Sequence, residues 1–237
     1  MDAMIGDIKA GTRPVVACAM SDRDVERIGR AQVRHIDLVE LRVDLFRRLS
    51  PDYVAGVFTG AKRRLSRPIL GTVRLPHEGG RAAMDEETRY ALFETIVLLA
   101  DAVDIEIRSR IFPDVVALAH RYGKPAIASY HDLEKTPADD MLLKMVSKAR
   151  RGSADIIKLA LMANGIDDVV HLLRFTMDHR KDRLITVSLG RVGMVSRVVN
   201  PLFGSLVTYG YVGRPKADGQ MRVDRLAEQI RMYWSGR

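Results

Sequence analysis

The feature of this sequence that most constrains its fold is a regular alternation of short apolar runs with longer amphipathic segments along the whole chain. Eight runs have the length and the Val, Ile and Ala content of strands buried on both faces. They lie at residues 14–20, 37–44, 68–74, 103–107, 124–130, 153–161, 184–188 and 205–209. Parallel strands need crossover connections, and a helical pattern after each run supplies one. We therefore expect an α/β fold, a (β/α)8 TIM barrel with a parallel eight-stranded core.

Helical patterns fill the intervals between these runs. The expected helices cover residues 21–31, 50–65, 84–100, 111–122, 136–151, 167–179, 195–200 and 223–234. Ser21 is placed to cap the first helix, and Pro51 takes the first helical position of the second, where its missing N–H costs nothing. A doubly wound open sheet is the alternative architecture, but it usually carries a glycine-rich turn after its first strand. The segment 20–24 reads Met-Ser-Asp-Arg-Asp and has no glycine, which favours the barrel.

Length and composition indicate a single catalytic domain over residues 1–237. With 237 residues and 47% hydrophobic content, the chain can bury a large core in one barrel. Cys18 is the single cysteine, which excludes an internal disulfide, and no Cys/His cluster suits a metal. The N-terminus is mixed and polar, unlike a signal peptide, and no long apolar window could span a membrane. We expect a cytoplasmic protein without a membrane anchor, a metal or a cofactor.

The formal net charge of +8 raises the question of an anionic partner. The basic clusters at 62–64, 150–151 and 180–183 are scattered, and each lies near the end of an expected helix, where the helix dipole favours cations. A nucleic-acid binder more typically has a concentrated basic stripe and a recognisable module. We therefore expect no nucleic-acid partner. A basic barrel that binds RNA or a protein stays open as the non-enzymatic alternative, and it predicts binding that weakens steeply with salt.

The sixth expected strand carries a lysine, Lys158, among apolar residues. Strand alternation places Ile156, Lys158 and Ala160 on one face and the intervening residues on the other. An ammonium on an enclosed apolar face loses hydration, so its pKa falls and the neutral, nucleophilic amine becomes accessible near neutral pH. This is the chemistry of a Schiff-base lysine. The alternative is a lysine whose stem lies on apolar surface while its head reaches water.

The second expected strand carries charged residues at every other position. In a barrel the chemistry lies at the C-terminal ends of the strands. Glu40, Arg42 and Asp44 are spaced by two, so they share one face and are expected to point into the barrel. Buried charge at this density is costly unless it is paired, which indicates a functional site. An internal Glu–Arg ion pair that fixes the barrel is the alternative.

Two further strand ends carry polar residues. The third strand ends at Arg74, with Glu78 just beyond it. The fifth ends in Ser-Tyr-His-Asp, which places His131 at the barrel mouth on the strand next to that of Lys158. A nucleophilic amine beside an acid/base group is the minimal requirement for imine-mediated proton abstraction. The other histidines fall in helix ends or loops, where we expect surface positions.

Taken together, these motifs resemble the type I 3-dehydroquinate dehydratases of the shikimate pathway, in the order in which that family carries them. The matching stretches are Val39–Asp44, Thr72–Gly80, Ser129–Pro137, Asp155–Ala160, Ser196-Arg197 followed by Phe203–Ser205, and Gly219-Gln220. The resemblance covers nearly the whole chain. It implies a lyase, a hydro-lyase that dehydrates 3-dehydroquinate to 3-dehydroshikimate in chorismate and aromatic amino acid biosynthesis, acting through a Schiff base without a cofactor.

The resemblance also implies roles for individual residues. Lys158 would form the Schiff base with the substrate ketone. His131 would remove the proton α to the iminium and later protonate the departing hydroxyl, while Glu78 would hold this histidine in position. The residues implied in substrate binding are Glu40, Arg42 and Arg74 on the hydroxyl side, Arg197 at the carboxylate, and Gln220 in a lid loop.

Some positions depart from the family pattern, and one rival enzyme class stays open. Where the lid often reads Ser-Ala-Pro-Gly-Gln, this chain has Lys216-Ala-Asp-Gly-Gln, so we transfer the glutamine and leave Lys216 out of the site. Cys18 lies near a position where some relatives have serine, and we expect it in the core. A class I aldolase-like lyase on another carbonyl substrate is the rival, and the stretch 188–193 could imitate its phosphate site. The resemblance further implies a possible homodimer.

Overall fold

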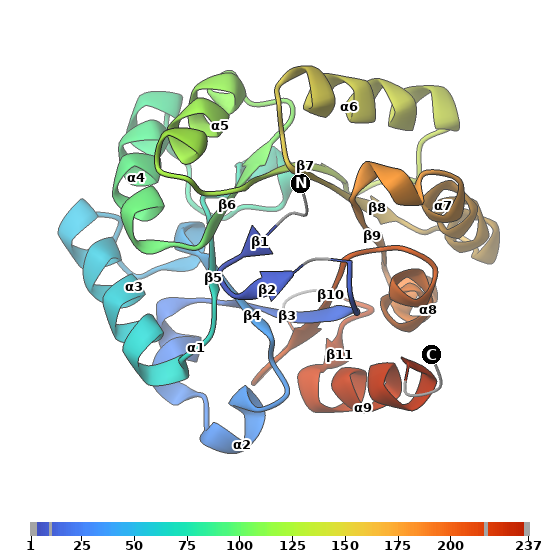
Figure 1. Cartoon of the computed structure of the whole chain (residues 1–237), viewed down its shortest axis with the longest axis horizontal. Helices are drawn as coiled ribbons and strands as arrows, with labels where there is room; N and C mark the ends of the chain where they lie inside the picture. The colour runs from blue at the N-terminus through green and yellow to red at the C-terminus, as the bar shows by residue number, and fades with distance from the viewer. Residues whose placement is uncertain (1–3, 10, 216–217, 235–237) are drawn as a thin grey trace.

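The protein is an eight-stranded parallel barrel surrounded by helices (Figure 1). The structure is a computed structural model that describes residues 4–9, 11–215 and 218–234. The barrel strands are β3 Val15–Met20, β4 Leu38–Arg42, β5 Ile69–Thr72, β6 Ala102–Glu106, β7 Ala126–Asp132, β8 Ile156–Met162, β9 Leu184–Leu189 and β10 Val207–Tyr211. Each pairs in parallel with its neighbour from β10–β3 through β8–β9. All eight expected strands are confirmed.

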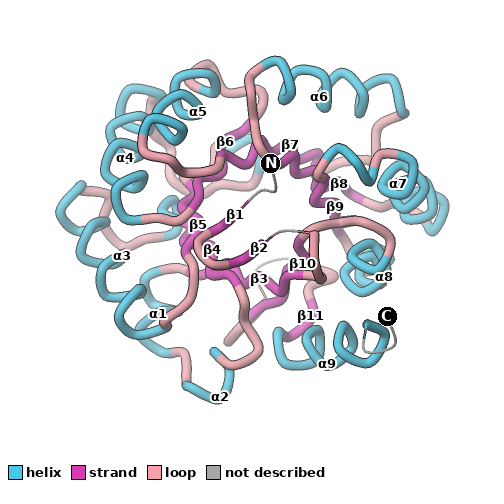
Figure 2. The backbone as a smooth tube through the Cα atoms, in the orientation of Figure 1, coloured by secondary structure: helices cyan, strands magenta, loops and turns pink. Residues whose placement is uncertain are grey.

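Strands β9 and β10, the two strands that meet where the barrel closes, are joined near their N-terminal ends. The Leu206 amide donates to the Leu184 carbonyl at 2.8 Å, and the Thr186 amide donates to Ser205 Oγ at 2.9 Å. Beyond the seam, the short strand β11 Met221–Arg222 adds to β10 in parallel. The strands thus curl into a ring inside a ring of helices (Figure 2), with these two bonds rather than a ladder of paired residues across the β9–β10 seam of the described structure.

The helices match the expected positions, with one difference at the start. They are α1 Asp22–Arg27, α2 Arg30–Val33, α3 Pro51–Leu65, α4 Glu86–Leu99, α5 Phe112–Arg121, α6 Asp139–Arg151, α7 Ile166–Asp178, α8 Ser196–Leu202 and α9 Val223–Trp234, with short 3-10 turns η1 Val43–Leu45, η2 Pro76–Glu78, η3 Arg180–Asp182 and η4 Val192–Val195. The prediction of one helix over 21–31 was wrong, because Ile28 turns to extended backbone and Gly29 starts a new helix. Ser21 does cap α1, and Pro51 does open α3.

Two apolar layers hold the barrel together. An outer layer between strands and helices includes Ile157 and Leu159, whereas Ile156 and Ala160 belong to an inner layer within the barrel. The alternation predicted for the lysine strand is therefore confirmed. A hairpin that the sequence did not predict, β1 Met4–Ile5 and β2 Ile8–Lys9, crosses the end of the barrel seen in Figure 1, and its Ile5 side chain completes the inner layer.

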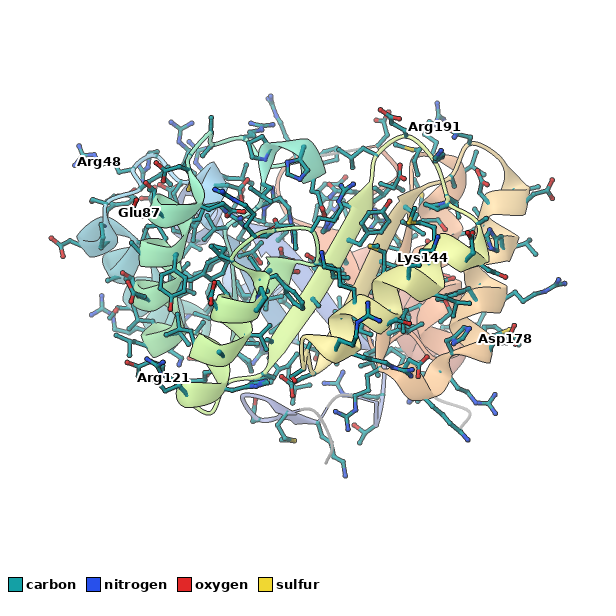
Figure 3. The ribbon with its side chains drawn as sticks, turned by 90° about the horizontal axis from the view of Figure 1, so that it is seen from above. Arg48, Glu87, Arg121, Lys144, Asp178 and Arg191 are labelled. Atoms are coloured by element: carbon teal, nitrogen blue, oxygen red, sulfur yellow. The ribbon has the colours of Figure 1, made fainter. Side chains whose placement is uncertain are left out.

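Charged side chains are spread around the outside of the barrel. The basic residues Arg48, Arg121, Lys144 and Arg191 lie far apart in Figure 3, among acidic residues such as Asp178. The clusters at 62–64 and 150–151 occupy the last turns of α3 and α6, as predicted from the helix dipole. Among the described residues, no helix has the length and apolar character needed to cross a bilayer.

The fit between β5 and its covering helices gives a test of this packing. Gly71 lies under α3 and α4, and a Cβ there would come within 2.1 Å of Ile96 Cγ2. We expect Gly71→Ala to lower the free energy of unfolding by about 1–3 kcal/mol, as overpacked core positions do. Urea denaturation measures this effect.

Gly56→Ala is the matched control for this substitution. Gly56 lies exposed in α3, and its added Cβ would contact nothing within 4 Å. It should raise the free energy of unfolding by about 0.5–1 kcal/mol, because alanine loses less conformational freedom in a helix. If Gly71→Ala unfolded at the same urea concentration as the parent, the close packing of β5 against α4 would be contradicted.

Candidate active site

Polar side chains from five neighbouring strands converge at the C-terminal half of the barrel. The apolar inner residues Leu38, Leu70, Ala102, Ile127 and Ile156 form the floor. Alternation by two then places a polar residue above each of them on the same inner face. These residues are Glu40, Thr72, Asp104, Ser129 and Lys158, and all are buried. The same pattern that builds the core therefore aims the polar groups into one pocket.

Lys158 lies at the bottom of this pocket. Lys158 is only 5% exposed, so the alternative prediction, in which its ammonium group reaches water, is wrong. Its Nζ donates to Glu40 Oε2 at 3.3 Å and to Asp104 Oδ2 at 3.1 Å, and lies 4.4 Å from the centre of the Tyr209 ring. The surroundings of the amine are thus charged on two sides and aromatic on a third, rather than apolar as its sequence neighbours suggested.

Arg74 is the centre of a buried network beside the lysine. Its guanidinium donates to Asp104 at 2.8 Å, to Glu106 at 2.9 Å and to Ser129 Oγ at 2.7 Å. Burial alone would raise the pKa of Asp104, but Arg74 and Lys158 outweigh it and hold this pKa well below its usual range. Asp104 therefore stays a carboxylate that holds both cations.

His131 is held by a carboxylate that is itself held by an arginine. Glu78 Oε2 accepts from the His131 backbone amide at 2.8 Å and lies 3.0 Å from its Nδ1, while Glu78 Oε1 accepts from Arg108 Nε at 2.9 Å. The carboxylate thereby favours the tautomer with the proton on Nδ1, which leaves Nε2 as the basic ring nitrogen. Burial lowers the pKa of His131 well below its usual value, and Arg74 and Lys158 lower it further.

Glu40 and Arg42 follow each other on the inner face of β4 but have separate partners. Arg42 makes a bidentate ion pair with Asp44 at 2.7 and 2.8 Å and donates to the Gly79 carbonyl at 3.1 Å. Glu40 instead contacts Lys158, with Arg74 NH2 at 4.0 Å. Asp44 was expected on the strand, but it lies in the following 3-10 turn η1. Within this strand and its following turn, the arginine Arg42 therefore pairs with Asp44 rather than with Glu40.

Arg197 provides a buried cation on the opposite wall. Its Nε donates to the Gly219 carbonyl at 2.7 Å and its NH1 to the Tyr209 carbonyl at 3.0 Å. It is 3% exposed, and in the described part of the chain no acidic side chain pairs with it. Burial lowers the pKa of this guanidinium to about 10, which leaves it charged at neutral pH.

The loop after β10 is anchored at its far end. Gly219 has φ +73°, and a Cβ there would lie 1.9 Å from the Gly190 carbonyl oxygen, so only glycine fits this contact. Together with the Arg197 hydrogen bond, the contact fixes the backbone just before Gln220, which is half-buried. Lys216, which we left out of the site, lies outside the described residues.

Six contributors to the pocket were not assigned to the site from the sequence. They are Thr72, Asp104, Glu106, Arg108, Ser129 and Tyr209. The spacing by two that drew attention to β4 was equally present in the Asp-Ile-Glu of β6, so Asp104 and Glu106 could have been found. Cys18 is buried in the outer layer, as expected, and His77 and His120 are exposed.

The fold and the site together define a class: a (β/α)8 barrel with a buried amine on its sixth strand and a neutral imidazole on the adjoining fifth. Residues 14–235 match the family model described as type I 3-dehydroquinase. The 3-dehydroquinate dehydratase of Thermodesulfovibrio yellowstonii is 34% identical over 89% of this chain and 91% of its own. That of Methanococcoides burtonii is 34% identical over 96% of this chain and 98% of its own.

Solved structures give the same result. The 3-dehydroquinate dehydratase from Geobacillus kaustophilus has a TM-score of 0.88 at 29% identity and covers 99% of both chains. The type I enzyme from Clostridium difficile, which contains covalently modified comenic acid, has a TM-score of 0.89 at 25% identity and covers 100% of this chain and 99% of its own. The chain belongs to the type I 3-dehydroquinase family. Its activity is the dehydration of 3-dehydroquinate, a hydro-lyase step of the shikimate pathway, which sets aside the aldolase-like alternative.

The environment of His131 predicts an unusual titration. Because the folded protein holds its pKa below that of a free imidazole, at about 6.5, His131 should remain neutral as pH falls through that value. A lowered folded pKa contributes stability above pH ~6.5 that is lost as pH falls through the folded pKa. Ring nitrogen chemical shifts measured by NMR follow the titration, with His131→Asn identifying the signal. A His131 signal that titrates near the free value would contradict the assignment.

Proposed function

We propose that the dehydration proceeds through a Schiff base between Lys158 Nζ and the substrate ketone. The observation that carries the proposal is the buried amine of Lys158 between Glu40 and Asp104, on the strand paired with that of His131. Register places Ser129 opposite Lys158 and His131 opposite Ala160, so the imidazole sits one layer closer to the barrel mouth. A ketone bound to the amine would therefore present its neighbouring carbon toward the imidazole. The covalently modified ligand in the Clostridium difficile relative supports this chemistry.

The amine must lose a proton before it can attack. Two carboxylates lie within 3.3 Å of Nζ, and each is close enough to accept this proton. Asp104 is a poor acceptor for that proton, because its pKa lies well below the usual range. Glu40, which lies 3.3 Å from Nζ and 4.0 Å from the Arg74 guanidinium, is the better placed base. We therefore assign Glu40 the first proton transfer, in addition to its place on the hydroxyl side of the substrate.

His131 then carries the protons of the elimination. The protonated imine is an electron sink that makes the proton on the neighbouring carbon acidic. Nε2 of neutral His131 takes this proton, an enamine forms, and the enamine expels the hydroxyl on the next carbon as the imidazolium returns the proton to it. Glu78, braced by Arg108, keeps the ring in one orientation through both transfers.

The remaining site residues bind the substrate. Arg197 suits the substrate carboxylate, because it is a buried cation without an acidic partner among the described residues and its planar fork can hold a carboxylate by two bonds. Arg42 is half-buried at the end of β4, and we assign it to the hydroxyl side of the substrate. Arg74 is nearly saturated by internal partners, with only Nε left without a hydrogen bond, so its contribution to that side is small. Gln220, next to the anchored Gly219, closes the pocket.

We further propose that the chain works in the cytoplasm as one catalytic domain over residues 1–237, as a homodimer and without a nucleic-acid partner. Exposed apolar side chains of η4, α8 and α9, among them Met194, Val195 and Tyr233, support association because they line a cavity of about 550 Å³ on the outer surface. Sedimentation equilibrium measures the state. Val195→Lys should shift the mass to that of a monomer, and a monomeric parent protein would exclude the homodimer.

The Schiff base has a direct test. Borohydride added during turnover of 3-dehydroquinate should reduce the imine and leave one covalent adduct on Lys158, detected by mass spectrometry of peptides. Lys158→Ala should abolish both the adduct and the ultraviolet absorbance of the enone product. Absence of any adduct in the parent protein would exclude Lys158 as the nucleophile.

His131→Ala is the companion variant for the same assay. Without the imidazole, proton abstraction should be slower by about a hundredfold or more, whereas the amine can still reach the ketone. The variant should therefore give an adduct on Lys158 while forming little enone. Unchanged turnover in this variant would overturn the acid/base assignment without affecting that of Lys158.

A further inference from the structure

Tyr209 lies in the pocket and has no part in the steps described above. It follows Val207 on the inner face of β10, and it is 8% exposed. Its ring faces Lys158 Nζ at 4.4 Å from the ring centre, a distance at which the π-face attracts a cation. Tyr209 thus borders the atom at which the Schiff base would form.

The hydroxyl of Tyr209 is a buried polar group that lacks a hydrogen bond. No described residue bonds Oη with acceptable geometry, although the Glu40 carboxylate is near it. Burial raises the pKa of this phenol well above its usual value, and the charges of Glu40 and Asp104 raise it further, so the hydroxyl keeps its proton.

A hydroxyl in this state destabilises the fold. An unmade hydrogen bond in a buried site leaves the desolvation cost of the group uncompensated, and phenylalanine would fill the same space without that cost. Groups on the outer surface of the barrel cannot form a hydrogen bond with Oη, because the side chain points into the pocket. Because the hydroxyl is retained in the pocket despite this desolvation cost, we expect the ligand to supply the acceptor for its hydrogen bond.

We propose that Tyr209 is a further catalytic residue, whose hydroxyl donates a hydrogen bond to the ketone oxygen of the substrate while its ring faces the cation on Lys158. The proposal rests on imine formation by Lys158, the proposed function above. In the carbinolamine, Nζ and the former ketone oxygen are bonded to the same carbon. A donor that borders both Nζ and Glu40 is therefore placed at that oxygen.

The step balances without an outside acid or base. The ammonium of Lys158 loses a proton to Glu40, the lone pair of Nζ forms the C–N bond, and the π pair of the carbonyl moves to oxygen. Tyr209 stabilises the negative charge that develops there and keeps its own proton. The oxygen takes one proton back from Glu40 and a second from Nζ, leaves as water with the C–O pair, and the nitrogen lone pair forms C=N. Two of the three ammonium protons leave in the water, and one stays on the iminium.

The ring contributes to the same step through the charge on nitrogen. The cation is on Nζ in the free enzyme as the ammonium and again in the imine as the iminium. Because the π-face attracts both, it keeps the nitrogen in one place as the bond forms and favours the iminium over its neutral precursor. Loss of the ring and loss of the hydroxyl therefore have different consequences, which two substitutions can separate.

Tyr209→Phe removes the hydroxyl and keeps the ring. A donor to a developing oxyanion contributes as much as about 10²–10³ in rate, and we expect borohydride trapping in single-turnover quench experiments to show imine formation slowed by about ten- to a hundredfold. The conversion of imine to product should stay within about twofold of the parent. The melting temperature should be equal or higher, because an unpaired buried hydroxyl has been removed. Tyr209→Leu should in addition lower the equilibrium fraction of trapped imine several-fold, as expected for a lost cation–π contact.

Tyr90→Phe is the matched control, because it removes a phenol hydroxyl from α4, on the outside of the barrel. It should leave imine formation unchanged. Imine formation at the parent rate in Tyr209→Phe would overturn the proposal, and so would a slower rate accompanied by an equal loss in Tyr90→Phe. If the parent protein itself gave no adduct on Lys158, the Schiff base would fail first, and the outcome would be distinguishable from failure of the Tyr209 assignment alone.

Discussion

The constraint on which the rest of this site depends is the neutralisation of charge inside the barrel. Inside the barrel lie the buried cations Arg74 and Lys158 with the carboxylates Glu40, Asp104 and Glu106, and the buried Arg89 of α4 joins them from outside. Glu106 joins the two arginines, since it contacts Arg74 at 2.9 Å and also pairs with Arg89 from α4, and Asp104 joins Arg74 to Lys158. Removal of any one member leaves a buried charge uncompensated, which typically costs about 3–5 kcal/mol. The amine is therefore positioned from a helix outside the barrel through a chain of ion pairs.

The barrel could be predicted because its strands and helices are specified locally. Strands β3 to β8 are apolar on their outer face, helices α1, α3 and α4 have a local start signal, and the alternation leaves few other topologies. The break between α1 and α2 was missed, because Ile28 continues the apolar pattern while its backbone leaves the helix. The hairpin over the barrel end was missed as well, since two strands of two residues carry no periodicity.

The pocket could be predicted only where a charge stood out from apolar neighbours on one strand. Lys158 and Glu40 met that condition, and the structure places them at hydrogen-bond distance. Arg42 and Asp44 also stood out, but their pairing with each other depends on the turn that follows β4, which the pattern does not show. Tyr209 could not be found from spacing, because an aromatic residue at an inward position is usually part of the core. The role proposed for it rests on a buried hydroxyl that makes no hydrogen bond of acceptable geometry with the described residues.

The distribution of charge in the pocket explains how one orientation of the substrate is selected. The Lys158 end is bordered by Glu40 and Asp104, which repel a carboxylate, whereas Arg197 on the opposite wall lacks an acidic partner among the described residues. In the function proposed here, this distribution directs the carboxylate of the substrate toward Arg197 and its ketone toward the amine. The same two carboxylates are the hydrogen-bond partners of Lys158 Nζ. In the proposed mechanism the groups that repel the wrong end of the substrate therefore also hold the nucleophile, and one of them, Glu40, takes the proton that the amine loses before the first bond forms.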